Sequence, residues 1–197
     1  MKVLLLGATG KIGRDIYNEL RYEEDIELSV MVRNPNKMEI TCPTFLGSAD
    51  DVSALSQAMS SQEILVASLD GKNILQIAQA VVKAAKSSGV SNIIWLTGFG
   101  IHNEIKVAEG LILKALLKAR PEYAQAADVI ANSGLDYALL RLPNVIDGPA
   151  TAYHLTEEGQ KHVTSRISRA TIAKVIKDIL QGNTTLVKGS IGVTQAK

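Results

Sequence analysis

Three glycines, Gly7, Gly10 and Gly13, recur at intervals of three residues in the segment GATGKIG, directly after the apolar run KVLLL. A strand that turns sharply, lets a ligand approach its backbone and then starts a helix packed closely on a sheet uses glycines in this order. The first turn of such a helix offers free N–H groups and partial positive charge to a phosphate. The pattern therefore predicts a site for a dinucleotide pyrophosphate, the alternative being a purely structural turn. The same loop and first helical turn contain Thr9, Lys11 and Ile12.

An arginine follows the second apolar run, in the segment VMVRNPNK. Sites selective for NAD usually carry Asp or Glu at the end of this strand, where the carboxylate accepts hydrogen bonds from the ribose. Arg33 stands there instead, and a guanidinium can pair with a ribose 2′-phosphate through two hydrogen bonds, with Lys37 adding charge nearby. The residue type favours NADP(H), against the alternative of an ordinary solvated arginine.

The elements that position these residues alternate along the chain. Short apolar runs typical of buried parallel strands occur at residues 2–7, 26–33, 44–47, 63–69, 92–100 and 135–143, and 184–190 is interpreted as a last edge strand. Apolar residues at helical spacing predict helices that begin near Ile12, Asp51, Lys72 and Ser168. The same spacing predicts a helical segment over 103–134, in two pieces divided at Pro121. This order predicts a doubly wound parallel α/β sheet, the Rossmann fold, as a single domain over residues 1–197 with a small C-terminal substrate-side region.

Composition excludes several classes of protein. The 197 residues are 46% hydrophobic with a net charge of +1, so neither disorder nor an electrostatic footprint for nucleic acid or membrane is expected. No apolar run approaches the length of about 18 residues needed for a membrane span. The lone Cys42 suits a reducing cytoplasm, where we expect the protein to be located. No metal site is expected, because the three histidines, His102, His154 and His162, lack metal-ligand spacing.

Five segments in order, GATGKIG, VMVRNPNK, IIWLTGFG, GLDYALLRLPNVID and SRISRATIAKVI, resemble the NmrA-like, NAD(P)H-binding group of atypical short-chain dehydrogenases. Within that group the chain looks most similar to the flavin reductase or biliverdin-IX beta reductase type, over almost its whole length. The resemblance implies that Arg33 binds the 2′-phosphate and that the pyrophosphate lies against Gly7, Thr9, Gly10, Lys11 and Ile12.

The resemblance also implies contacts at the later strand ends. The family's Gly-Asp pair, whose Asp approaches the adenine, appears here as Gly47 and Ser48, followed by Ala49, so a serine hydroxyl and backbone groups replace a carboxylate. The remaining implied contacts are Leu69 and Asp70 for the adenosine-side ribose and pyrophosphate, Thr97, Gly98 and Phe99 beside the nicotinamide, and Pro143, Asn144 and Val145 at the carboxamide. Two of these residues have structural alternatives: Thr97 as a helix cap and Pro143 as a strand terminator.

A missing pair decides the expected chemistry. Most short-chain dehydrogenases use a tyrosine and a lysine four residues later, and none of the five tyrosines here has that partner. A planar acceptor such as a flavin or linear tetrapyrrole takes hydride while its proton comes from solvent, so the protein mainly has to hold two flat rings together. We therefore expect an NADPH-dependent oxidoreductase with Thr97 and Tyr153 on the substrate side. An equally good interpretation of Tyr153 is a half-buried loop tyrosine without a role in the reaction. The alternative is a non-catalytic NADP(H) sensor that engages a protein partner.

Overall fold

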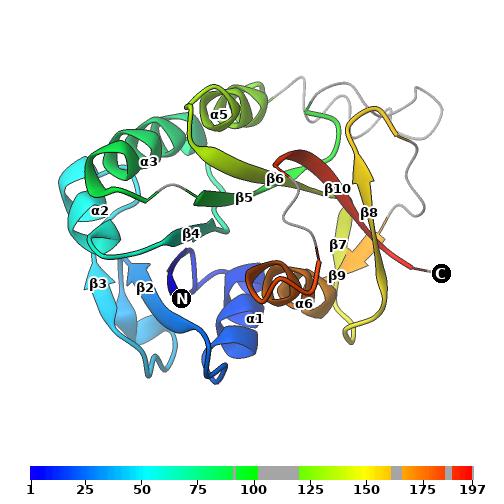
Figure 1. The fold of residues 1–197 in the computed structure, drawn as a ribbon, viewed down its shortest axis with the longest axis horizontal. Coiled ribbons are helices and arrows are strands. Elements are labelled where there is room, and N and C mark those ends of the chain that lie inside the picture. Colours follow the sequence, from blue (N-terminus) through cyan, green and yellow to red (C-terminus); the bar gives the residue numbers. More distant parts are fainter. Residues whose placement is uncertain (91, 102–119, 161–165, 185–187, 197) are drawn as a thin grey trace.

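The computed structural model describes residues 1–90, 92–101, 120–160, 166–184 and 188–196. In this part of the chain, eight strands form one sheet in the order β3-β2-β1-β4-β5-β6-β10-β8, and β7 pairs with β9 in a small second sheet (Figure 1). The strands are β1 (Lys2–Leu6), β2 (Glu27–Val32), β3 (Thr44–Leu46), β4 (Ile64–Ala67), β5 (Asn92–Gly98), β6 (Asp136–Leu142), β7 (Asn144–Ile146), β8 (Tyr153–Glu157), β9 (Arg166–Ser168) and β10 (Gly189–Gln195). The helices are α1 (Lys11–Leu20), η1 (Pro35–Lys37), α2 (Val52–Met59), α3 (Ile74–Ser88), α5 (Glu122–Ala131) and α6 (Arg169–Leu180).

The strand order reverses beside β1. The chain builds β2 and β3 on one side of β1, then crosses back to place β4, β5 and β6 on the other side, with every one of these pairs parallel. Ligands of doubly wound sheets bind in the crevice outside the carboxyl ends of the strands at such a switch point. The predicted Rossmann fold is confirmed, and the switch lies between β1 and β4.

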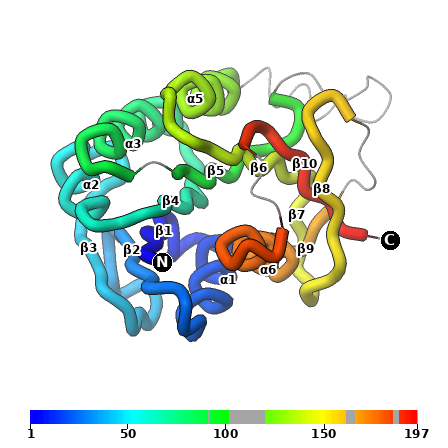
Figure 2. Tube along the Cα trace, in the orientation of Figure 1, coloured from blue at the N-terminus to red at the C-terminus, as the bar shows by residue number. Residues whose placement is uncertain are grey.

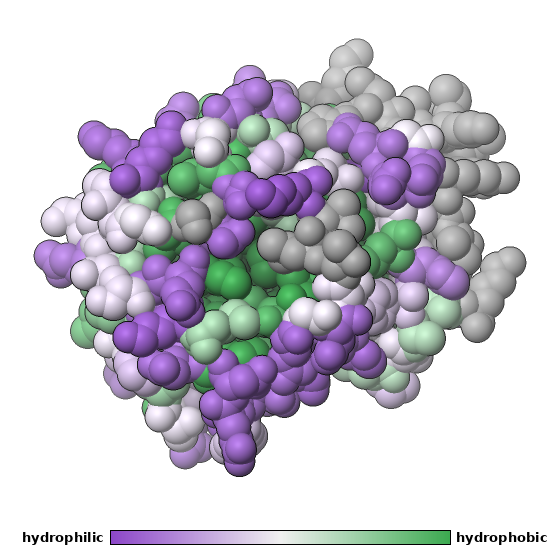
Figure 3. Space-filling view, viewed as in Figure 1, coloured by the Kyte–Doolittle hydropathy of each residue, from purple (hydrophilic) through white to green (hydrophobic). Residues whose placement is uncertain are grey.

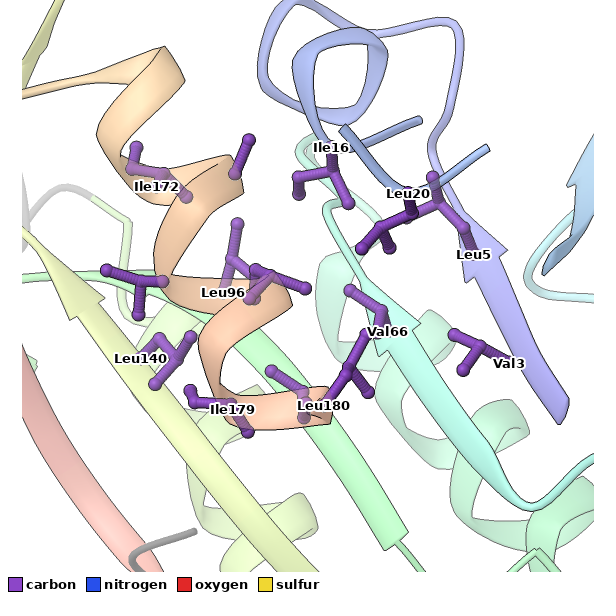
Figure 4. Packing of buried hydrophobic residues seen from close by; sticks show 14 of the residues in the cluster. Val3, Leu5, Ile16, Leu20, Val66, Leu96, Leu140, Ile172, Ile179 and Leu180 are labelled. Atoms are coloured by element: carbon purple, nitrogen blue, oxygen red, sulfur yellow. The ribbon is translucent and has the colours of Figure 1, made fainter. Parts of the chain in front are cut away.

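Helices cover both faces of the sheet because side chains alternate along each strand. Val3 and Leu5 of β1 face α1 and α6, whereas Leu4 and Leu6 face α2, α3 and α5. Figure 4 shows the first of these two cores, where Ile16 of α1 points into the same layer as side chains of α6 and of the strands. The ten labelled residues of this core are Val3, Leu5, Ile16, Leu20, Val66, Leu96, Leu140, Ile172, Ile179 and Leu180.

Capping side chains fix several helix ends where the sequence predicts them. The Asp51 carboxylate accepts hydrogen bonds from the N–H groups of Ser53 and Ala54 at the start of α2. The Ser168 hydroxyl accepts one from Thr171 at the start of α6, and Gly89 ends α3 in the left-handed conformation. Each cap satisfies backbone groups that have no partner within the helix.

The C-terminal strand differs from its prediction as an edge strand over residues 184–190. It is β10, residues 189–195, and it lies inside the sheet between parallel β6 and antiparallel β8 (Figure 2). The edge strands are β3 and β8. The error has a physical reason: the segment GSIGVTQ carries glycines and polar residues as edge strands do, and its pairing with β8 joins segments far apart in sequence.

Two further expectations have different outcomes. The second piece of the helical segment predicted over 103–134 is α5, whereas the first piece lies in 102–119, outside the described residues. His102 and His162 also lie outside them.

Among the described helices, none has the length and apolar character required to cross a membrane. Figure 3 shows hydrophilic residues over most of the rim of one face and apolar residues toward its middle.

The close backbone approach between Gly7 and Gly13 yields a stability prediction. A Cβ on Gly13 would lie 2.0 Å from the carbonyl oxygen of Gly7 and 2.7 Å from its carbon, both backbone atoms that cannot rotate away. We expect Gly13→Ala to lower the free energy of unfolding by about 1–3 kcal/mol, although alanine is the better helix former. Urea unfolding measures this change.

Gly148→Ala provides the matched control. Its new Cβ would meet only Ser168 Cβ at 3.5 Å, an ordinary contact, so we expect little change in stability. Equal unfolding midpoints for both variants and the wild type would contradict the proposed packing constraint at Gly13.

Candidate dinucleotide site

The loop between β1 and α1 requires glycine at two of its three predicted positions. Gly7 has φ +86°, and a Cβ there would lie 2.0 Å from the carbonyl oxygen of Ser68, at the end of β4. The Gly10 N–H donates to the Gly7 carbonyl at 2.9 Å and closes the turn. With Gly13 packed on Gly7, the loop brings β1, β4 and the start of α1 together with no side chain between them. This bare backbone fits a pyrophosphate.

The N-terminus of α1 differs from those of α2 and α6. Gly10 occupies its N-cap position, so no side chain caps it, whereas Asp51 and Ser168 cap the other two helices. Because no side chain accepts hydrogen bonds from its first N–H groups, these groups and the helix dipole can bind an anionic group of a ligand. Thr9, Gly10 and Lys11 lie at this end, while Ile12 packs partly against the core below it.

Positive side chains gather beyond the end of β2. Arg33 follows the strand directly and is exposed, and Lys37 ends the short helix η1. Arg14, which the sequence analysis did not single out, extends from α1 and donates from Nη2 to the Lys37 carbonyl at 3.3 Å. The guanidinium of Arg14 therefore belongs to the same region as the predicted 2′-phosphate ligands.

The loop after β3 contains a carboxylate that the sequence analysis also missed. Ser48, predicted to face the adenine, directs its hydroxyl to Asp50. This hydrogen bond holds the pKa of Asp50 below its ordinary value, with further contributions from the Asn73 amide at 3.0 Å and the charge of Arg33. Asp50 therefore stays ionised beside the predicted adenosine end. The motif search missed Asp50 because it stands two positions after the place where the family carries its acid.

The ends of β4 and β5 contribute two polar groups. Leu69 packs against the core beside Gly7, and Asp70 after it is exposed. Thr97 is only 7% exposed, and its Oγ1 has no hydrogen-bond partner among the described residues. A buried hydroxyl without a partner costs stability unless a ligand or water completes it. Thr97 lies within β5 and caps none of the described helices, so nothing in this part of the chain supports its alternative as a helix cap.

The remaining predicted cofactor residues lie beside Thr97. Gly98 pairs in register with Leu142 of β6, and the Phe99 N–H donates to the Leu142 carbonyl at 3.0 Å. A Cβ on Gly98 would meet open space, whereas the Phe99 ring is buried against Gly192 and near the Arg141 guanidinium. Phe99 therefore contributes packing, while Gly98 leaves backbone accessible. Pro143 separates β6 from β7, which begins with exposed Asn144 and half-buried Val145.

Tyr153 lies apart from this group. It begins β8 instead of lying in a loop, and its hydroxyl donates to Asp178 of α6 at 2.9 Å. Lys174 also pairs with Asp178 and places its ammonium 5.4 Å from the Tyr153 ring centre. Burial, the hydrogen bond and the Asp178 charge raise the pKa of Tyr153 to about 12. Tyr153 packs on the α6 side of the sheet. Trp95 of β5 faces the α3 and α5 side and Leu96 faces the α6 side, so alternation along β5 places Thr97 on the same face as Trp95, opposite to Tyr153.

The predicted cofactor residues thus follow the carboxyl edge of the sheet in strand order. Arg33 and Ser48 lie at the β2 and β3 end, the glycine loop at β1, Asp70 at β4, and Thr97 at β5. Tyr123 of α5, also missed, joins this edge through a hydrogen bond to Asp70. The described residues contain no cluster of His, Cys, Asp and Glu suited to a metal ion. A glycine cradle, an uncapped helix end and cations at the adenosine end fit a dinucleotide.

Comparisons with known proteins agree with this geometry. A family model described as NAD(P)H-binding matches residues 7–183. No curated protein matches the sequence significantly.

Solved structures with this fold cover nearly the whole chain. A Rossmann-fold NAD(P)-binding family protein from Shigella flexneri is 30% identical, with a TM-score of 0.81 over 98% of this chain and 93% of its own. A short-chain dehydrogenase/reductase from Veillonella parvula, solved in complex with NADP, is 25% identical, with a TM-score of 0.83 over 98% and 94%. ChuY from Escherichia coli, an anaerobilin reductase, shares the fold at 23% identity, with a TM-score of 0.83 over 100% and 98%.

Arg33 gives a prediction about cofactor choice. If its guanidinium pairs with the 2′-phosphate, Arg33→Asp replaces a charge-assisted contact of about 1.5–3 kcal/mol with repulsion. We expect NADPH affinity to fall by about 10- to 100-fold and NADH affinity to change far less. Titration calorimetry with both nucleotides measures the two constants, and an equal effect on both would remove Arg33 from the 2′-phosphate site.

Tyr153 gives a prediction about pH. Because its folded pKa is raised to about 12, the folded protein keeps this proton where the unfolded chain, with an ordinary tyrosine pKa of about 10, releases it. The resulting stabilisation is fully present below about pH 10 and is lost as the pH rises to about 12. We expect the difference in unfolding free energy between the wild type and Tyr153→Phe to stay constant below about pH 10 and to shrink above it. A difference that stays constant throughout urea titrations up to about pH 12 would contradict this assignment.

Proposed function

The chain belongs to the NAD(P)H-binding family, and from this premise we propose that it is an NADPH-dependent reductase that passes hydride to a flavin or similar planar acceptor. The observation that carries the proposal is the Thr97 hydroxyl, buried and without a partner among the described residues, at the strand end where a nicotinamide is expected. The absence of a tyrosine and lysine pair favours an acceptor that needs no tyrosine acid.

The residues of the carboxyl edge have distinct roles in this proposal. The loop from Gly7 to Gly10 and the first turn of α1 bind the pyrophosphate through backbone N–H groups. Arg33 and Lys37 pair with the 2′-phosphate and thereby select NADPH over NADH. When bound, the reduced nicotinamide supplies the hydride.

Thr97 orients the reacting groups. Its hydroxyl is enclosed by the protein, so a hydrogen bond from it to the nicotinamide carboxamide or to the acceptor forms without competition from bulk water. Tyr153 is unsuited to proton donation, because burial and Asp178 raise its pKa and it lies on the other face of the sheet. The proton for the reduced acceptor therefore comes from solvent, as flavin and tetrapyrrole chemistry allows.

The second candidate function is a non-catalytic NADP(H) sensor, and the placement of Tyr153 on the α6 face supports it. Without an assembled acid near Thr97, the protein would bind NADP(H) and report its redox state to a protein partner without turnover. The fold itself favours the first function, because a solved protein that shares it is a reductase.

The first experiment is anaerobic oxidation of NADPH, followed by nicotinamide absorbance, with FMN, riboflavin, a quinone or biliverdin as acceptor and NADH in parallel. We expect acceptor-dependent turnover that prefers NADPH. Tight NADPH binding without turnover for any acceptor would overturn the reductase and favour the sensor.

Thr97→Val tests the residue on which the proposal depends. The variant preserves shape and removes the hydroxyl, so we expect kcat to fall on the order of 10- to 100-fold while NADPH affinity changes little. Thr194→Val is the matched control, because Thr194 is another buried threonine whose Oγ1 has no partner among the described residues. Equal losses in both variants would show a general packing effect and remove Thr97 from the site.

A further inference from the structure

Asp70 stands just beyond β4 with its two carboxylate oxygens in different surroundings. The Gly71 N–H donates to Oδ1 at 2.8 Å, the Tyr123 hydroxyl donates to the same oxygen, and Arg120 Nη2 lies 3.7 Å from it. The side chain is nevertheless 82% exposed. Two hydrogen-bond donors and one nearby cation therefore hold Oδ1, whereas no group among the described residues donates a hydrogen bond to Oδ2, which remains available as an acceptor.

The group that holds Asp70 is constructed from two distant segments. The Gly71 N–H also lies 3.3 Å from the Tyr123 hydroxyl oxygen, and Gly71 has φ +137°, a conformation that other residues rarely adopt. The Arg120 guanidinium stacks 4.5 Å from the centre of the Tyr123 ring. Partial burial and the bond to Asp70 raise the pKa of Tyr123, so its hydroxyl keeps the proton that it donates. The carboxylate is thus oriented before any ligand arrives.

The position of this cluster in the sheet identifies its half of the site. Tyr123 belongs to α5, which packs over β5 and β6 through Ala127 and Ile130, on the side of β4 away from β1. Arg33 lies beyond β2, on the other side of β1, while Asp50 is joined to the Asp70 loop through the Asn73 amide. In a doubly wound sheet each half holds one mononucleotide. Because β4 is the first strand of the second half and Tyr123 holds Asp70 from that half, we assign Asp70 to the nicotinamide mononucleotide, although the family resemblance placed it at the adenosine side.

We propose that Asp70, Tyr123 and Arg120 form a clamp for the ribose attached to the nicotinamide, in which Asp70 Oδ2 accepts hydrogen bonds from the ribose hydroxyls. Tyr123 and Arg120 are positioning residues that act through Asp70. A bare carboxylate near a pyrophosphate is repelled by it, and the Arg120 charge offsets that repulsion. The inference rests on the proposed course of the dinucleotide along the carboxyl edge and does not depend on the acceptor.

The test separates the two halves of the ligand. Calorimetry gives the dissociation constants of NADPH, NADH and adenosine 2′,5′-bisphosphate, which lacks the nicotinamide ribose, for wild type, Tyr123→Phe and Asp70→Asn. Tyr123→Phe keeps the ring that stacks on Arg120 and removes only the hydroxyl. We expect it to weaken NADPH and NADH by a similar factor of about three to ten, and Asp70→Asn to weaken both by about tenfold. The affinity of adenosine 2′,5′-bisphosphate should not change in either variant, which also shows that the fold is intact.

Tyr22→Phe is the matched control, because the Arg21 guanidinium lies 4.5 Å from the centre of the Tyr22 ring, but Tyr22 is exposed and follows the C-terminal end of α1. It should bind all three ligands as the wild type does. Unchanged NADPH affinity in Tyr123→Phe and Asp70→Asn would overturn the clamp. Equal weakening of adenosine 2′,5′-bisphosphate would also overturn it, because the residues would then act on the adenosine side or on the fold. These constants require no turnover, so an absence of acceptor reduction would overturn the proposed reaction without altering this result.

Discussion

The rest of the structure depends on the contact of two glycines with backbone carbonyls. Gly7 touches the carbonyl of Ser68 and Gly13 touches the carbonyl of Gly7, at distances that exclude any Cβ. This double contact holds β1, β4 and the start of α1 together at the place where the strand order reverses. Because α1 is fixed there, its uncapped N-terminus opens on the carboxyl edge, and the loops after the other strands line the same edge. One steric constraint therefore sets both the packing of the first helix and the position of the anion site.

Acidic side chains along this edge each lie near an arginine of opposite charge. Asp50 lies near Arg33, and Asp70 lies near Arg120. An isolated carboxylate at either position would repel a phosphate, whereas a paired one can accept hydrogen bonds from a sugar or base with less repulsion. The two pairs are joined through Asn73, whose amide donates to Asp50 and which is the N-cap residue of α3, directly after the loop of Asp70.

The proposed reaction site and the Tyr153 cluster lie on opposite faces of the sheet. Thr97 and Tyr123 serve the side of α3 and α5, whereas Tyr153 is bound into α6 through Asp178 and Lys174. Alternation along the strands makes this division unavoidable, because neighbouring residues of one strand face opposite layers. A tyrosine held on the α6 face stabilises the C-terminal strands and does not reach an acceptor next to Thr97. In the proposed reductase, this arrangement leaves solvent as the source of the proton.

The sequence by itself determined the Rossmann fold and the nucleotide loop, because their signals are local: glycine spacing, helical periodicity and caps such as Asp51 and Ser168 are contained within a few residues. It also marked Arg33 and Thr97, since each directly ends a strand recognisable from its apolar run. Only the tertiary structure decided which distant side chains meet. Tyr123 contacts Asp70 across 53 positions of sequence, Tyr153 contacts Asp178 across 25, and β10 inserts between β6 and β8. Such pairings follow from the register of the strands and the packing of helices on a common sheet, and no local pattern encodes them.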